Sequence, residues 1–116
     1  MKNRRFHERL GFACSGIMVA WTNEKSFRTQ LIMALLVLPL MLWLNPSPLW
    51  WAVMIIMGAL VMAAELFNTA LEHLIDHLHP EIHPSIKVAK DCAAGAVLIL
   101  SIAALLVSAA LLWAHL

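Results

Sequence analysis

Acidic and amide side chains recur at helical spacing in the middle of the chain. Glu65, Asn68, Glu72 and Asp76 follow one another at intervals of three, four and four residues, and Thr69 lies among them. At about 100° per residue, all five fall on one helix face roughly 100° wide. An apolar run precedes them, so this face would lie where a helix leaves a membrane. Ionisable groups are costly at that depth and therefore indicate function.

The chemistry of this face is that of a cation site. Carboxylates close together repel one another unless a cation lies among them, and oxygen ligands of this kind suit Mg²⁺ with substrate phosphates. We expect Glu24, Lys90 and Asp91 at the same level on neighbouring segments, where a lysine beside a metal suits phosphoryl transfer. Glu65, just inside the lipid, could take a proton from a membrane-borne alcohol.

Two other interpretations of the same face remain open. A polar network could simply hold the helices together, although such networks use Ser, Thr or Asn rather than this many acids. The face could also belong to a small cation or proton transporter. A pathway needs polar groups across the whole membrane, yet the far halves of the apolar segments offer little beyond Ser101 and Ser108. A site at one boundary instead favours chemistry between a cytoplasmic and a lipid substrate.

The composition of the chain requires a membrane. Of its 116 residues, 62% are hydrophobic and 13% are charged, and the mean hydropathy is +0.81. A soluble domain of this size has too little interior to bury so much apolar surface. The net charge of +1 argues against a nucleic-acid partner, which would need a basic surface.

The apolar segments predict an all-α integral membrane protein formed by one domain, 1–116. Residues 4–22 have apolar positions at helical spacing but are too polar to span, so we expect an amphipathic helix on the membrane surface. The Asn-Pro-Ser-Pro run at 45–48 is a turn. A spanning helix needs about 20 apolar residues. The three transmembrane helices are expected at about 26–44, 49–78 and 88–115.

Positive residues predict the orientation of these helices. Six of the eight Lys and Arg residues lie before the first span or in its first turn and two lie between the second and third spans, with none in the 45–48 turn. Cytoplasmic loops collect Lys and Arg, so we expect the N-terminus and the 77–90 segment inside. Three short helices cannot by themselves shield the acidic face, which predicts self-association.

Three runs of the sequence resemble the bacterial diacylglycerol kinase family, which includes undecaprenol kinases. Residues 64–76 (AELFNTALEHLID) are similar to its E-x-x-N-[ST]-A-[IL]-E-x-x-x-D motif, and residues 89–97 (AKDCAAGAV) to its A-K-D-x-x-[AS]-[AG]-A-V block. Residues 20–28 (AWTNEKSFR) match A-W-x-N-E-x-x-F-R. The resemblance covers nearly the whole chain.

The resemblance implies a homotrimeric enzyme of the bacterial inner membrane that transfers the γ-phosphate of ATP to a lipid alcohol. The acceptor would be diacylglycerol, giving phosphatidic acid, or alternatively undecaprenol. Carried over by position, Glu65 would be the base, and Glu24 and Glu72 would bind Mg²⁺. The implied nucleotide-binding residues are Arg5, Phe12, Glu24, Asn68, Glu72, Glu81, Ile82, His83, Lys90 and Asp91.

The resemblance also implies a lipid site. Phe12 stands where one branch of the family has Tyr, and Gln30 stands where that branch has Glu. His73 and His77 have the spacing of a zinc pair on a helix, but helical arithmetic turns them away from the carboxylate face, and we interpret them as headgroup-level histidines. The implied lipid-binding residues are Arg5, Arg9, Trp21, Ser26, Gln30, Glu65 and Ala94.

The predicted orientation is tested with single cysteines in a protein whose Cys14 and Cys92 are replaced by serine. A cysteine introduced at Ser47 should react with an impermeant thiol reagent added to intact cells, because that turn is expected outside. A cysteine at Ser85 should react only after the cells are opened. Labelling of the cysteine at position 85 in intact cells would contradict the predicted orientation.

Overall fold

The computed structural model describes residues 3–81 and 83–116, and its regular structure there is entirely helical. Three of its four helices are long and apolar enough to cross a membrane, which confirms the expected all-helical class and the three candidate spans. Ile82, a predicted nucleotide-binding residue, lies outside the described residues. The helices are α1 (Phe6–Asn23), α2 (Lys25–Leu44), α3 (Pro48–Leu78) and α4 (Pro84–His115).

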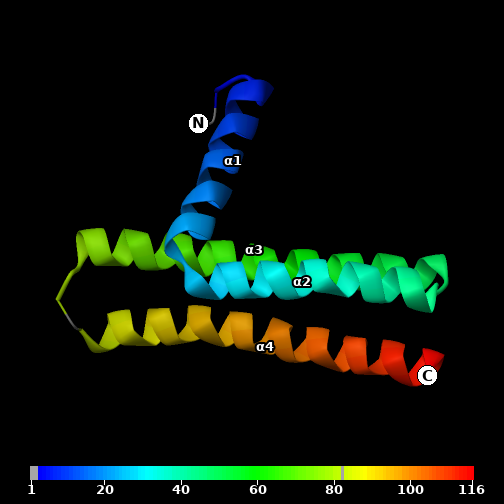
Figure 1. Cartoon of the computed structure of the whole chain (residues 1–116). Helices are drawn as coiled ribbons and strands as arrows, with labels where there is room; N and C mark the ends of the chain where they lie inside the picture. The colour runs from blue at the N-terminus through cyan, green and yellow to red at the C-terminus, as the bar shows by residue number, and fades with distance from the viewer. Residues whose placement is uncertain (1–2, 82) are drawn as a thin grey trace.

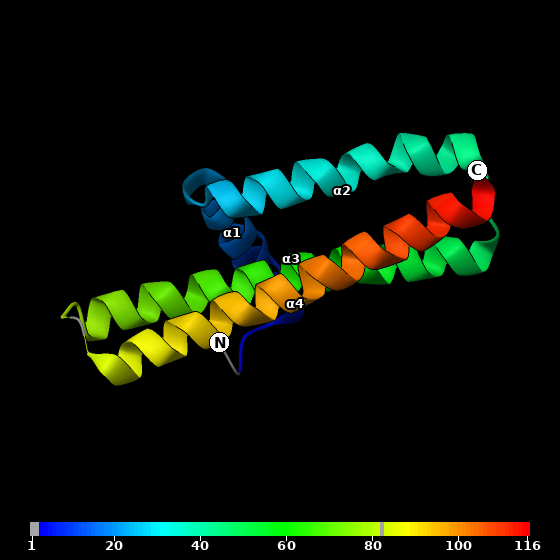
Figure 2. The ribbon, with the colours of Figure 1, turned by 90° about the horizontal axis from the view of Figure 1, so that it is seen from below.

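The three long helices run side by side in alternating directions. α3 packs most extensively on α4 and also packs on α2, so it lies against both of the other spans. α2 and α4 run in one direction and α3 runs in the other, while α1 projects steeply away from them (Figure 1). In the view from below, α2 is separated from the pair formed by α3 and α4 along most of its length (Figure 2). The 45–47 turn and the C-terminus lie together at one end.

Unequal helix lengths create two levels in the molecule. α2 has 20 residues and is about 30 Å long, which matches the hydrocarbon core of a bilayer. α3 and α4 have 31 and 32 residues, and at the same rise each is about 47 Å long. Their ends next to the 79–83 connection therefore extend beyond the level at which α2 begins (Figure 1). Glu65 lies about 26 Å along α3, close to that level.

Local sequence signals explain where α2 ends and where α4 begins. Asn45 ends α2 in the left-handed conformation (φ 48°), which Asn tolerates, and its N–H donates to the Met41 carbonyl over 2.9 Å. α4 begins at Pro84 rather than near residue 88. The His83 ring accepts a hydrogen bond from the backbone N–H of Ser85 at 3.1 Å. Proline is favourable in the first turn of a helix, so Pro84 starts α4.

Very little of the chain is buried within a single copy. The apolar side chains of α1 illustrate this: Phe6 is 77% exposed and Leu10 is 53% exposed. An apolar helix face that is open in one chain suits a membrane surface. The buried hydrophobic residues among those described are Ala20, Phe27, Met41, Val61 and Leu111.

Candidate functional site

The corner between α1 and α2 sets the position of the site. One amino group of the Arg28 guanidinium, Nη1, donates to the backbone carbonyls of Trp21 and Thr22, each at 2.9 Å. These carbonyls belong to the last turn of α1, where no intrahelical partner is available to them. Ala20 is fully buried at the same corner, where its small side chain permits close packing. The corner holds Glu24 beside α3.

Glu65 is almost completely buried, with 3% of its surface exposed. Its Oε1 accepts a hydrogen bond of 2.7 Å from the Ser26 hydroxyl in the first turn of α2. A buried carboxylate without a partner is strongly unfavourable, so this contact stabilises the charge where α2 meets α3. Phe27 is 2% exposed and fixes the neighbouring turn of α2.

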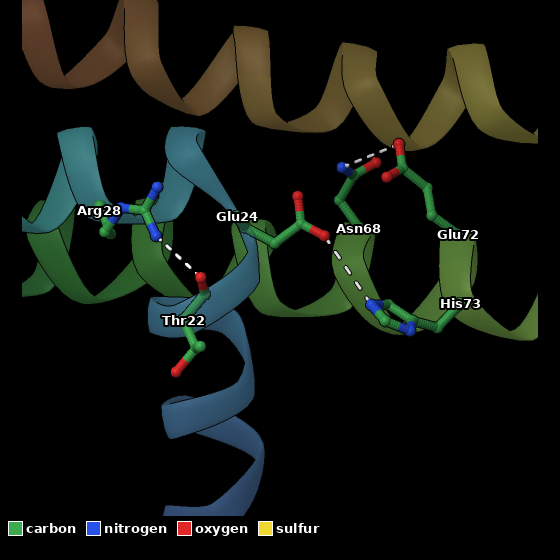
Figure 3. Close-up of polar contacts among 6 residues, drawn as sticks. All are labelled: Thr22, Glu24, Arg28, Asn68, Glu72 and His73. Carbon is green, nitrogen blue, oxygen red and sulfur yellow. Dashed lines mark hydrogen bonds and ion pairs between the residues drawn. The ribbon is translucent and has the colours of Figure 1, made fainter.

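Asn68 and Glu72 lie one and two turns further along α3. Figure 3 shows both side chains on the side of α3 toward α4, and the Asn68 amide N–H donates to Glu72 Oε1 at 3.4 Å. The amide oxygen of Asn68 is buried and has no hydrogen-bond partner among the described residues. Such an orphaned acceptor is uncommon in native structures and calls for a ligand or water.

Glu24 reaches from the α1–α2 corner to the same stretch of α3. Its Oε1 lies 3.8 Å from Nε2 of His73 (Figure 3). The helical period predicts that His73 points away from the carboxylate face, and its ring does lie apart from Glu72 in Figure 3. It nevertheless contacts a predicted site carboxylate, because the corner brings Glu24 to that flank of α3.

Two ion pairs lie further along, toward the 79–83 connection. Lys90 Nζ is 2.6 Å from Asp76 Oδ1 and joins α4 to α3, while Lys87 Nζ is 2.6 Å from Asp91 Oδ2 within α4. These groups are partly or largely exposed, and exposed pairs contribute little stability. Lys90 and Asp91 therefore have side chains that a charged ligand could recruit at small cost.

A groove with a volume of about 650 Å³ lies among α2, α3 and α4. Its lining is mainly apolar, with Met33 and Val61 among its members, and Ser26 lies in its wall near Glu65. Gln30, one helical turn from Ser26, crosses to α4 and donates to the Ser101 hydroxyl at 3.1 Å. The groove therefore joins the buried carboxylate to an apolar space with a few uncharged polar groups.

Other predicted site residues lie elsewhere in the chain. Arg5 precedes α1, and Arg9 and Phe12 lie on this helix, which projects away from the long helices (Figure 1). Trp21 contributes its backbone carbonyl to the corner, and Ala94 is exposed on α4. Within one copy, the structure does not bring these five residues to the carboxylates.

Glu81 and His83 lie in the exposed connection between α3 and α4. A hydrogen bond from its own backbone, and one from the His79 ring at 3.3 Å, hold the pKa of the Glu81 carboxyl below its usual value. The carboxylate is therefore charged at neutral pH. His83 caps α4 through Ser85, as described above.

Comparison with known proteins decides the family. The family model for prokaryotic diacylglycerol kinase matches residues 11–112. A diacylglycerol kinase of Escherichia coli K12 is 33% identical over 105 residues, covering 90% of this chain and 86% of that protein. A Synechocystis diacylglycerol kinase is 37% identical over 87% of this chain and 58% of that protein. A Bacillus subtilis undecaprenol kinase is 31% identical over 84% of this chain and 80% of that protein.

The chain belongs to the prokaryotic diacylglycerol kinase family. This confirms the resemblance and places the protein in a family of lipid kinases, for which ATP use is implied. The transporter interpretation consequently loses its support. Kinases use ATP together with Mg²⁺, so the site residues can be compared with what this metal requires.

The residues of this diacylglycerol kinase family member fit Mg²⁺. Among residues 3–81 and 83–116, no three His, Cys, Asp or Glu side chains are grouped closely enough to hold a metal unaided. Mg²⁺ instead takes one or two protein carboxylates and completes its shell with phosphates and water. Glu72 and the adjoining orphaned oxygen of Asn68 are oxygen donors of that type, while Glu24 contacts His73 on the other flank of α3.

Most of these residues could be predicted from the sequence, but the contacts between them could not. Ser26 and Glu65 were both predicted, but 39 positions separate them, and no spacing rule links them. The pairing of Gln30 with Ser101 spans 71 positions. The signal for Ser101 was a lone polar residue in an apolar helix, which usually finds a partner across a helix interface.

Replacing Glu72 with Gln tests the metal site. This change keeps size and hydrogen bonding but removes the charge that Mg²⁺ needs. Activity should collapse at ordinary Mg²⁺ while the protein still assembles, as measured by titration of activity with Mg²⁺. The matched control is Glu8→Gln, which removes a carboxylate on α1 that pairs with Arg4 at 3.7 Å. Near-normal turnover of Glu72→Gln would exclude the assigned role.

Proposed function

We propose that this protein transfers the γ-phosphate of ATP to the hydroxyl of diacylglycerol, giving phosphatidic acid. The supporting observation is the position of buried Glu65, which lies at the level where α2 begins and is linked by Ser26 to an apolar groove. A water-soluble nucleotide can approach from the ends of α3 and α4. A lipid alcohol can approach from the groove, so the two substrates meet at the carboxylate.

The roles of the residues follow from this arrangement. Glu65 accepts the proton of the lipid hydroxyl as its oxygen bonds to the γ-phosphorus, and ADP leaves. Glu24, Asn68 and Glu72 would bind the metal–nucleotide pair. Mg²⁺, when bound with ATP, supplies positive charge that offsets the phosphate charge.

Lys90 and Asp91 would help hold the triphosphate at the ends of α3 and α4. The bond of Lys90 to Asp76 keeps its ammonium group at the junction of the two helices until phosphate oxygens compete for it. Glu81, Ile82 and His83 would lie near the adenine. Arg5 and Phe12 complete the proposed nucleotide set.

The groove favours a glycerolipid as the acceptor. Gln30 lies about 6 Å along α2 from Ser26, which is next to Glu65. In diacylglycerol, ester carbonyls lie a few bonds from the free hydroxyl and can only accept hydrogen bonds. After the bond between Gln30 and Ser101 is counted, a second amide N–H of Gln30 and the Ser101 hydroxyl proton remain as donors. A polyprenol has no acceptor beyond its hydroxyl to match them.

Undecaprenol is the second candidate acceptor. A relative named undecaprenol kinase matches 84% of this chain at 31% identity. The largely apolar wall of the groove would also suit a polyprenol chain.

We also propose that the protein functions as a homotrimer in the bacterial inner membrane, with its N-terminus in the cytoplasm. The distribution of Lys and Arg supports that orientation. Glu24 and Glu72 are only half-buried in a single copy. Neighbouring copies would cover these charges and the apolar surface around them.

The acceptor is tested by competition. The purified protein receives radiolabelled ATP and Mg²⁺ with equal amounts of diacylglycerol and undecaprenol in mixed micelles. Phosphatidic acid should carry most of the label, because only diacylglycerol satisfies the donors of Gln30 and Ser101. Label mainly in undecaprenyl phosphate would establish the second candidate, and label in neither lipid would refute a lipid kinase.

Variants of the groove sharpen this competition. Gln30→Leu and Ser101→Ala should each lower phosphorylation of diacylglycerol relative to undecaprenol by about three- to tenfold, the value of one hydrogen bond. Ser108→Ala is the matched control, because Ser108 lines the same groove while its hydroxyl donates to the Ala104 carbonyl at 2.8 Å. If neither variant changes the ratio of phosphorylated diacylglycerol to phosphorylated undecaprenol, Gln30 and Ser101 do not recognise the acceptor.

The base is tested with Glu65→Gln. Loss of a general base costs about 10²–10⁴ in rate, while the groups that bind the nucleotide remain. The variant should bind ATP–Mg²⁺ normally and transfer phosphate at least about a hundredfold more slowly. Nucleotide affinity and kcat are measured separately. Loss of ATP binding with kcat preserved at saturation would make Glu65 a nucleotide ligand instead.

A further inference from the structure

Ser26 stands between the groove and the proposed base. Glu65 is 3% exposed, and the groove is lined by Ser26 but not by Glu65. Ser26 is an exposed residue, and its hydroxyl donates a partly buried hydrogen bond to Glu65 Oε1 at 2.7 Å. A lipid alcohol lying in the groove therefore meets the serine hydroxyl before it meets the carboxylate.

We propose that Ser26 relays the proton from the acceptor alcohol to Glu65. This inference rests on the proposed lipid kinase function. In the transfer step, the lipid oxygen bonds to the γ-phosphorus of ATP and the bond from that phosphorus to the β–γ bridging oxygen breaks, releasing ADP. The lipid O–H proton moves to Ser26 Oγ, and the proton already on Ser26 Oγ moves to Glu65. Ser26 is regenerated with a different proton, and Glu65 later returns its proton to solvent.

The chemistry of a hydroxyl suits this position. A serine hydroxyl has one donor and two acceptor lone pairs, so it can donate to Glu65 and still accept from an alcohol in the groove. General bases act at hydrogen-bond distance or through one intervening group such as water, and Ser26 occupies the place of that water. Direct contact with Glu65 would instead require the substrate to break the 2.7 Å bond and enter a sealed position.

The backbone holds Ser26 firmly enough for this role. The residue lies in the first turn of α2, between Glu24 at the corner and buried Phe27. Arg28 fixes the same turn through its two bonds of 2.9 Å to the end of α1. A group that transfers protons must keep its distances to within a fraction of an ångström, and these contacts restrict its movement.

The test compares Ser26→Val with Ser26→Thr in the full-length protein, using ATP–Mg²⁺ and whichever lipid alcohol the unmutated protein phosphorylates. Threonine and valine have nearly the same shape, but only threonine retains a hydroxyl. Ser26→Val should lower kcat by about tenfold or more, with little change in KM for the lipid or in ATP affinity. Ser26→Thr should retain clearly more of the activity. Equal kcat values for the two variants would overturn the relay.

A second measurement on the unmutated protein does not depend on the folding of a variant. In single turnovers, the transfer rate is followed as the deuterium fraction of the solvent rises. A relay moves two protons together and gives a curved dependence, whereas a linear or flat dependence would overturn it. If the unmutated protein phosphorylates neither lipid alcohol, the proposed function fails first. If it is active but Glu65→Gln is equally active, the base assignment fails and the relay fails with it.

Discussion

Carboxylates placed at the edge of a hydrocarbon layer are the constraint on which this structure depends. A charged side chain there loses most of its hydration and needs partners within the protein. Glu65 meets this demand with the Ser26 hydroxyl, and Glu24 lies close to His73. The remaining acceptor capacity, including the orphaned oxygen of Asn68, is what a metal–phosphate ligand can use. The same side-chain oxygen atoms therefore need partners for stability and are available to bind a ligand.

The unequal helix lengths determine which of these polar side chains are buried and which are exposed. α2 begins where the hydrocarbon layer would end, while α3 and α4 continue for several more turns. The α1–α2 corner lies at that step, secured by Arg28. The polar side chains of α3 consequently change along a single helix from buried Glu65 to largely exposed Asp76. One helix face thus passes from a buried to an exposed environment within about three turns.

The fold and much of the candidate site followed from local patterns. The helical period placed Glu65, Asn68 and Glu72 on one face, and the apolar lengths predicted three spans. Contacts between distant residues did not follow, because they depend on how α1 meets α2 and how far α3 rotates against its neighbours. The contact between Glu24 and His73 was therefore not predicted, and the positions of Ser26 and Glu65 in the sequence did not indicate their hydrogen bond. α4 begins four residues before the expected position of about 88, because proline is favourable in the first turn of a helix and Pro84 starts it.

The scarcity of buried side chains changes what stability means for this protein. Ala20, Phe27, Met41, Val61 and Leu111 are far too few to hold four helices together by exclusion of water. Acyl chains must solvate the rest of a membrane-spanning chain, and they act as ligands of the folded state. A melting temperature measured in a detergent is therefore a joint property of protein and amphiphile. Changing the amphiphile should shift it as much as many substitutions in the helices would.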